Sequence, residues 1–464
     1  MAFSTPSSFQ RRYAFLRYLI WVYCILILIE GALRKWVLPS LSNPLLVIRD
    51  PLVLLIYLCA VSKRCFPVNY FILGACVLGF FSFFFGLLSE SSNLLITLYG
   101  MRVNYLHLPL LFIIPFVMTR SDVILMGKFF LWTSLPMTVL EILQFYAPAD
   151  HWLNINPGGL DASSLTGGMG RLRSSGTFSF TQGLSAYFIY VAAFFLSFLI
   201  DKKRISKVFL IVAGIFLLIA IPASISRTLV LNSGILLIAA TLSLYFKKNT
   251  SQLLFRFLCV LSIVTSLAAF LPVFDEGIAS FQDRWVNATG TTGAEFKTNI
   301  VDRFLEGFSQ SYHLVEYAGI TGIGVGMGTN VATKLLTNQV GFLLAENEWS
   351  RIILELGSIL GVAFILYRVG LFYYLLKESY HHLRSGNALP FLIFSACGFS
   401  LLNGQWGPPT NLGFAILGGG LVLAACNPLD ETFMQKKQRR YYALKVLEAD
   451  PGTKTSLSRG SYTL

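Results

Sequence analysis

Long apolar runs recur along the whole chain, and they constrain its fold more than any other feature. A run of about 18 or more apolar residues is the signature of a helix that crosses a lipid bilayer. Only 13% of the 464 residues are charged, whereas soluble domains usually carry roughly 25%. Run length predicts about twelve membrane spans, at residues 13–33, 44–61, 69–88, 94–118, 122–146, 178–200, 207–223, 228–246, 253–272, 350–376, 389–403 and 411–427. The sequence therefore predicts an all-α, polytopic integral membrane protein.

Lysine and arginine lie mainly in the short segments between these runs, and their distribution predicts the orientation of the chain. Seven basic segments fall on one side of the predicted spans: Arg11/Arg12, Lys63/Arg64, Arg120/Lys128, Lys202/Lys203/Arg204/Lys207, Lys247/Lys248, Lys377/Arg384 and Lys436/Lys437/Arg439/Arg440. By the positive-inside rule this side is the cytoplasm, and both termini lie there. This rule accounts for the formal charge of +13. Because no basic face with interleaved aromatic residues occurs, we expect no nucleic-acid partner.

Four regions follow from this topology. The membrane domain covers residues 1–427, and it is interrupted by two substantial outward segments, 147–177 and 273–349. The first is rich in Gly, Pro, Ser and Asn. The second is the longest polar stretch between spans, and within it Phe296–Tyr317 has the mixed spacing of an amphipathic helix on a membrane surface. The basic and polar tail, 428–464, is expected to be cytoplasmic and partly disordered.

One stretch at the end of the long outward segment, residues 345–361, places charged residues at the mouth of a predicted span. Glu348, Arg351 and Glu355 are spaced by three and four residues, so they share one stripe of a helix. Ionisable groups in such a position are costly and are usually functional. We expect Glu355 to hold Arg351 in place.

Glu346 and Glu348 have two interpretations. They could complement the positive end of the helix, with Asn347 as its N-cap. Alternatively, one of them is a general base that takes a proton from a hydroxyl group beside Arg351. The sequence does not decide between these roles, nor between the two glutamates.

The outward side carries more cations than the positive-inside rule allows: Arg34, Lys35, Arg171, Arg173, Arg227, Arg284, Arg303 and Arg351. A phosphate-bearing ligand would explain this excess, because arginine binds phosphate through two parallel hydrogen bonds. We expect Arg227, Arg284 and Arg303 to bind it, with contributions from Arg173. The alternatives are an interfacial Arg227 and solvated loop arginines.

Two further charged groups lie inside predicted spans. Arg102 in the fourth span is either one half of a structural ion pair or a cation that faces an anionic ligand. Glu30, at the end of the first span, is expected to pair with Arg34 or Lys35, which lie about one turn later. No Asp-x-Asp pair occurs, the five histidines are scattered, and the seven cysteines lack metal-binding spacing. We therefore expect neither a metal nor a cofactor.

Four short motifs follow one another along the chain: Arg173 with Gly176-Thr177-Phe178; Ser226-Arg227; Gly324-Val325-Gly326 with Asn330; and Glu346-Asn347 followed by Glu355-Leu356-Gly357 and Gly361. In order and position they resemble the motifs of bacterial O-antigen ligases and O-antigen or exopolysaccharide polymerases. One departure is that the family's usual His is Glu346 here. This favours a polymerase-like branch with a carboxylate base over a lipopolysaccharide ligase.

The resemblance implies a metal-independent glycosyltransferase of the bacterial inner membrane. Its substrates would be a polyprenyl-diphosphate-linked oligosaccharide and a glycan acceptor, which meet at the periplasmic face among membrane lipids. The arginines would hold the donor diphosphate, and Glu348 or Glu346 would deprotonate the acceptor. An O-antigen ligase is one alternative. A polysaccharide or lipid transporter, such as a flippase, is another; it would use charged groups near the bilayer midplane, for which Arg102, Glu141 and Glu30 give some support.

Overall fold

The computed structural model describes residues 8–89, 93–157, 167–201, 205–247, 270–337 except 290–308, and 344–428 except Glu346, with a few residues between 255 and 266. All the regular elements in this part of the chain are helices. In chain order they are α1 (Ser8–Ala32), η1 (Leu33–Val37), η2 (Pro39–Leu41), η3 (Pro44–Val47), α2 (Arg49–Ser62), α3 (Tyr70–Leu88), α4 (Leu94–Met101), η4 (Arg102–Leu106), α5 (Leu108–Val117), α6 (Arg120–Tyr146), η5 (Trp152–Asn154), α7 (Thr181–Ile200), α8 (Lys207–Ala223), α9 (Arg227–Tyr245), α11 (Pro272–Thr289), α13 (Asn330–Thr337), α14 (Glu348–Arg384), α15 (Leu389–Asn403) and α16 (Pro409–Ala425).

Eight helical segments of the described chain are long and apolar enough to cross a membrane: Arg12–Val37, Pro44–Ser62, Tyr70–Leu88, Leu94–Val117, Arg120–Tyr146, Thr181–Ile200, Arg227–Tyr245 and Glu348–Arg384. Three shorter apolar helices, α8, α15 and α16, accompany them. This agrees with the predicted helical membrane protein. The predicted span at 253–272 lies largely outside the described residues, so the count of twelve stays a prediction.

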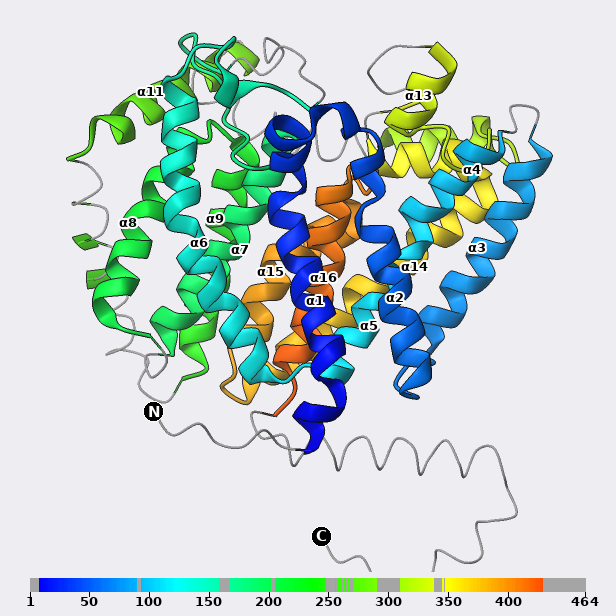
Figure 1. Cartoon of the computed structure of the whole chain (residues 1–464), viewed down its shortest axis with the longest axis horizontal. Coiled ribbons are helices and arrows are strands. Elements are labelled where there is room, and N and C mark those ends of the chain that lie inside the picture. Colours follow the sequence, from blue (N-terminus) through cyan, green and yellow to red (C-terminus); the bar gives the residue numbers. More distant parts are fainter. Residues whose placement is uncertain are drawn as a thin grey trace, which may run out of the picture.

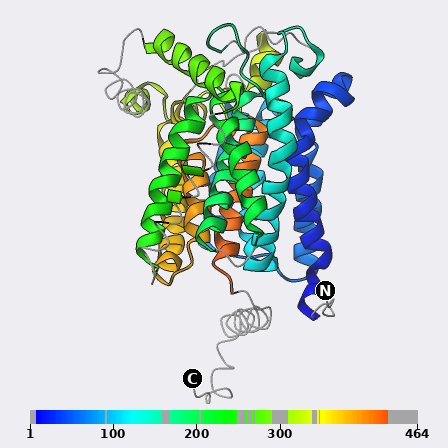
Figure 2. The same cartoon turned by 90° about the vertical axis from the view of Figure 1, so that its left-hand side faces the viewer.

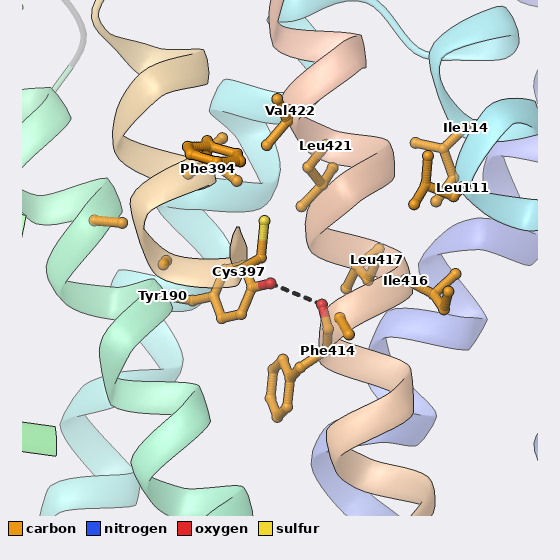
Figure 3. Packing of buried hydrophobic residues seen from close by; sticks show 14 of the residues in the cluster. Leu111, Ile114, Tyr190, Phe394, Cys397, Phe414, Ile416, Leu417, Leu421 and Val422 are labelled. Carbon is orange, nitrogen blue, oxygen red and sulfur yellow. Dashed lines mark hydrogen bonds between the residues drawn. The ribbon is translucent and has the colours of Figure 1, made fainter. Parts of the chain in front are cut away.

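Helix α16 lies in the middle of the bundle, behind α1 and beside α15 in the view of Figure 1. A run of glycines lets its neighbours approach closely: a Cβ on Gly418 would lie 1.8 Å from the hydroxyl of Tyr190. That hydroxyl donates a 2.7 Å hydrogen bond to the carbonyl oxygen of Phe414, as Figure 3 shows. Small residues at helix contacts are typical of membrane bundles, where close packing holds helices together.

The two ends of the bundle differ. Helix α1 begins and α16 ends at one end, whereas α11 and α13 lie at the opposite end (Figures 1 and 2). Thr181, Thr228 and Asn411, which lie in the first turns of α7, α9 and α16, line one cavity. The three helices therefore begin near one another. The beginnings of these helices therefore form the site described below.

Helix α14 is not the single straight span that the sequence predicts. It breaks at Gly357, whose φ of 81° and ψ of 178° are not helical. Its first turns fold back on the rest, because Glu348 and Arg368 are in hydrogen-bond contact at 2.8 Å. Twenty residues of a straight helix would separate them by about 30 Å. The carbonyl groups freed by the break are bonded by a turn around Gly322: Ile323 N donates to Leu354 O, and Gly324 N donates to Glu355 O.

Candidate functional site

A cavity of about 370 Å³ lies where α7, α9 and α16 begin. We call it the arginine cavity, because Arg173, Arg227 and Arg284 are the charged residues among the described residues of its lining. The lining also has apolar side chains, which include Ile189, Phe399 and Phe414. The cavity therefore combines a cationic part with a hydrophobic part.

The three arginines come from separate elements. Arg173 lies in the segment before α7, Arg227 is the first residue of α9, and Arg284 belongs to α11, which is not among the membrane-spanning candidates. Arg284 is anchored by a hydrogen bond from Nη1 to the carbonyl oxygen of Ile225, the residue two positions before Arg227. All three are among the residues predicted to bind one anionic ligand, and the structure brings their side chains to one cavity.

The electrostatics of the cavity favour an anion. Burial, together with the like charges of Arg173 and Arg227, lowers the pKa of Arg284 to about 10. Burial and the charge of Arg227 also lower the pKa of Arg173. Nε of Arg173 is buried and has no hydrogen-bond acceptor among the described atoms. A bound anion would relieve this repulsion and satisfy this donor.

Helix ends add to this field. No side chain caps the first turn of α7 or of α16, so the free N–H groups of both helices remain at the cavity. The positive ends of helices stabilise nearby anions. Helix α9 is capped by Ser226, whose hydroxyl accepts a hydrogen bond from Leu229 N.

A second cluster of charges surrounds Glu348, which is 2% exposed. Its Oε1 accepts three hydrogen bonds, from Arg368 Nη1 at 2.8 Å, from Arg351 Nη2 at 3.0 Å and from Trp406 N at 3.3 Å. Its Oε2 accepts one, from Arg351 Nε at 3.0 Å. Glu348 therefore sits as a carboxylate between two guanidinium groups, and Oε2 accepts fewer hydrogen bonds from the described residues than Oε1 does.

Arg351 is held on its other side as well. Nη1 pairs with Oε2 of Glu355 at 2.7 Å, and Nη2 donates to Oδ1 of Asn104 at 3.2 Å. Glu355 also accepts a hydrogen bond from Gly328 N, which ties the glycine-rich turn to the cluster. The Arg351–Glu355 ion pair that the one-turn spacing predicts is therefore present.

Arg368 is the residue that the sequence analysis missed. It donates to the carbonyl oxygens of Ser400, Leu401 and Gly404 at the end of α15, and its guanidinium carbon lies 4.0 Å from the centre of the Trp406 ring. A single arginine within an apolar run was the available signal, because such a charge needs a buried partner. Arg368 connects Glu348 to the segment between α15 and α16.

A small hollow of about 20 Å³ adjoins Glu348. We call it the Glu348 hollow; Arg351, Asn330 and Gln405 also line it. Gln405 lines the arginine cavity too. The Glu348 hollow and the arginine cavity therefore adjoin at Gln405.

Asn347 occupies the N-cap position of α14, but its side chain makes no capping hydrogen bond. Its Nδ2 instead donates to Oγ of Ser311 at 3.3 Å. Asn347 therefore takes the N-cap position that one interpretation gave it, but its side chain is bonded to Ser311 and does not cap the first turn of the helix.

Arg102 does not line the arginine cavity. It pairs with Asp50 at 2.8 Å and donates to the carbonyl oxygen of Leu46, so it takes the structural ion-pair role. Glu30 pairs with Arg49 at 3.0 Å and more loosely with Arg34 at 3.8 Å. Two residues predicted for the site, Glu346 and Arg303, lie outside the described residues.

No protein-family model matches this chain, and no curated protein is significantly similar to it. The geometry of the arginine cavity and of the Glu348 cluster is therefore the evidence for the function of this protein.

Proposed function

We propose that this protein is a glycosyltransferase that polymerises polyprenyl-diphosphate-linked glycan units at the periplasmic face of the bacterial inner membrane. The observation that carries the proposal is the convergence of Arg173, Arg227 and Arg284 on one cavity that also has an apolar wall. A lipid diphosphate has the matching chemistry, with a doubly anionic head and a hydrocarbon chain. Arginine binds such phosphates with geometric specificity.

In this proposal the arginines act on the leaving group. The acceptor hydroxyl attacks the anomeric carbon of the donor sugar, and the bond from that carbon to the phosphate oxygen breaks. The diphosphate leaves with its lipid, and the three guanidinium groups stabilise the negative charge that develops on it. The fixed positive charge of these side chains is the electrostatic contribution of the protein.

Glu348 is the proposed acceptor of the proton from the attacking hydroxyl. Oε1 is saturated by three donors, so the base is Oε2, which accepts a single hydrogen bond from Arg351. Glu348 lines the Glu348 hollow, and Gln405 lines both this hollow and the arginine cavity. The proposed base therefore lies close to the place proposed for the leaving diphosphate, as general base catalysis requires. Glu346 stays an alternative base.

A transporter of lipid-linked glycans is the second candidate, and two observations favour it. Helix α14 is broken at Gly357, and both carboxylate oxygens of the buried Glu141 lack a hydrogen-bond partner among the described atoms. Broken helices and intramembrane acids are common in transporters. An O-antigen ligase would use the same arginine cavity with a different acceptor.

Reconstitution separates these functions. Purified protein in proteoliposomes receives a polyprenyl diphosphate that carries one defined oligosaccharide unit. A polymerase lengthens the glycan on the lipid, a ligase requires a lipopolysaccharide core acceptor, and a transporter moves the intact lipid-linked unit across the bilayer. Arg227→Ala should abolish lengthening, whereas Gln282→Ala, an exposed change on α11, should not. Lengthening that persists in Arg227→Ala would contradict the proposal.

A further inference from the structure

A third hollow lies beside the other two. It is lined by Arg34, Ser179, Gln182, Thr410 and Asn411 among others, and we call it the Asn411 hollow. It encloses only about 10 Å³, so a ligand would rest on it rather than inside it. Neither the leaving diphosphate nor the base of the proposed reaction uses this hollow.

The three hollows meet around one segment, residues 404–411, between α15 and the first turn of α16. Gln182 and Asn411 line both the Asn411 hollow and the arginine cavity. Pro408 lines both the Asn411 hollow and the Glu348 hollow. The Asn411 hollow therefore borders both the place for the diphosphate and the place for the base.

The Asn411 hollow has fewer cations than the arginine cavity: its described lining includes Arg34, whereas three arginines line the cavity. Its other polar side chains are neutral amides and hydroxyls, from Gln182, Asn411, Thr410 and Ser179. Asn411 Nδ2 donates to Gln182 Oε1 at 3.4 Å, a long hydrogen bond on an exposed part of the surface. Amides offer both donors and acceptors, which suits the hydroxyl groups of a sugar.

Arg34, the cation among the described residues that line this hollow, already has hydrogen-bond and ion-pair partners. Arg34 donates from Nη1 to Oγ of Ser179 at 2.8 Å and from Nε to the carbonyl oxygen of Ser42 at 2.8 Å, and it pairs with Glu30. The hollow therefore offers mainly neutral hydrogen-bonding groups and one engaged cation, where the arginine cavity has three arginines. A neutral, hydroxyl-rich ligand fits it better than a second phosphate.

We infer that the Asn411 hollow is the saccharide subsite for the donor glycan, with Gln182 and Asn411 binding the sugar nearest the diphosphate. This inference rests on the proposed function. A glycosyl transfer has three parts, namely a leaving group, an acceptor with its base, and the donor sugar between them. The arginine cavity and the Glu348 hollow account for the first two, and the Asn411 hollow borders both.

Binding measurements with two lipids test the subsite without requiring turnover. The probes are a polyprenyl diphosphate without sugar and the same lipid carrying the repeat unit, isolated from the cells that produce this protein. We expect wild-type protein to bind the sugar-bearing lipid at least tenfold more tightly. The double variant Gln182→Ala with Asn411→Ala should reduce this ratio to near one, because it should weaken binding of the sugar-bearing lipid far more than binding of the sugar-free lipid. Gln282→Ala is the matched control, and it should preserve the ratio.

The outcomes separate the two proposals. If neither lipid binds to wild-type protein, the proposed function fails. If both lipids bind and the double variant keeps the wild-type ratio, the saccharide subsite is wrong while the lipid-diphosphate function stands. If the double variant loses affinity for both lipids equally, the amides support the arginine cavity and do not contact sugar, which also overturns the subsite.

Discussion

Arg368 donates a 2.8 Å hydrogen bond from Nη1 to Oε1 of Glu348, a residue 20 positions earlier in the same helix. This contact exists because α14 breaks at Gly357 and its first turns fold back. Both side chains are fully or almost fully buried. The fold-back brings a carboxylate, two arginines and the segment between α15 and α16 into one cluster beside the arginine cavity.

Removal of Arg368 should destabilise the protein, because it leaves Glu348 with one fewer partner in a buried site. Breaking a buried ion pair by deleting one partner costs about 3–5 kcal/mol. We expect Arg368→Ala to lower the thermal unfolding midpoint in detergent and to abolish polymer formation. Arg368→Lys keeps the charge but loses the bonds to Ser400, Leu401 and Gly404. Its unfolding midpoint should therefore lie between those of the wild-type protein and Arg368→Ala. An unchanged unfolding midpoint in Arg368→Ala would contradict the role of this pair.

Glu348→Gln tests the proposed base, and loss of the carboxylate charge between Arg351 and Arg368 should also lower the unfolding midpoint. Glutamine keeps the size of the side chain and one acceptor oxygen for Arg368, but it cannot accept a proton. We expect chain lengthening to fall by roughly 100-fold or more, within the range for loss of a general base, while affinity for the sugar-free lipid diphosphate stays within a few fold. Full activity in Glu348→Gln would instead identify Glu346, or another group, as the base.

Neutralising Arg284 should have opposite effects on stability and binding. Its folded-state pKa of about 10 lies below the ordinary value for arginine, so retaining the charge costs folding free energy at neutral pH, and that cost declines as the pH rises from about 10 towards the ordinary pKa. We expect Arg284→Gln to raise the unfolding midpoint of the ligand-free protein and to weaken lipid-diphosphate binding by at least tenfold. Arg227→Lys, which keeps its charge, is the comparison. A variant that is less stable and binds normally would refute this account.

Gly357 should tolerate no side chain. Its φ is +81°, and a Cβ there would lie 2.2 Å from the carbonyl oxygen of Ile320 and 2.6 Å from Gly322 N. Gly357→Ala should therefore open the fold-back and reduce both folded yield and activity. Gly234→Ala on α9 is the matched control, because nothing lies within 4 Å of its added Cβ. Equal yields of the two variants would show that the break is dispensable.

The sequence predicts the helices better than it predicts their meeting points. Apolar run length locates the spans, because the bilayer sets the length of a helix that crosses it. The spacing of Arg351 and Glu355 predicts their pairing, since both lie on one helical turn. Spacing does not reveal the fold-back at Gly357, because a glycine inside an apolar run also fits a continuous helix.

The arginine cavity could be predicted only in part. The excess of cations on the predicted outward side indicates an anionic ligand. Arg173, Arg227 and Arg284 nevertheless belong to three elements far apart in the chain, so only tertiary packing brings them together. Packing also removes Arg102 from the group, because Asp50 lies beside it. Arg368 could have been found from its position alone, as a charge inside an apolar run that requires a buried carboxylate.

The most direct test of the central claim is the stoichiometry of the reaction in proteoliposomes. We expect wild-type protein to release one polyprenyl diphosphate for each new glycosidic bond and Arg227→Ala to release none. Movement of the intact lipid-linked glycan across the bilayer, with neither bond formation nor release of lipid diphosphate, would contradict the account and support a transporter.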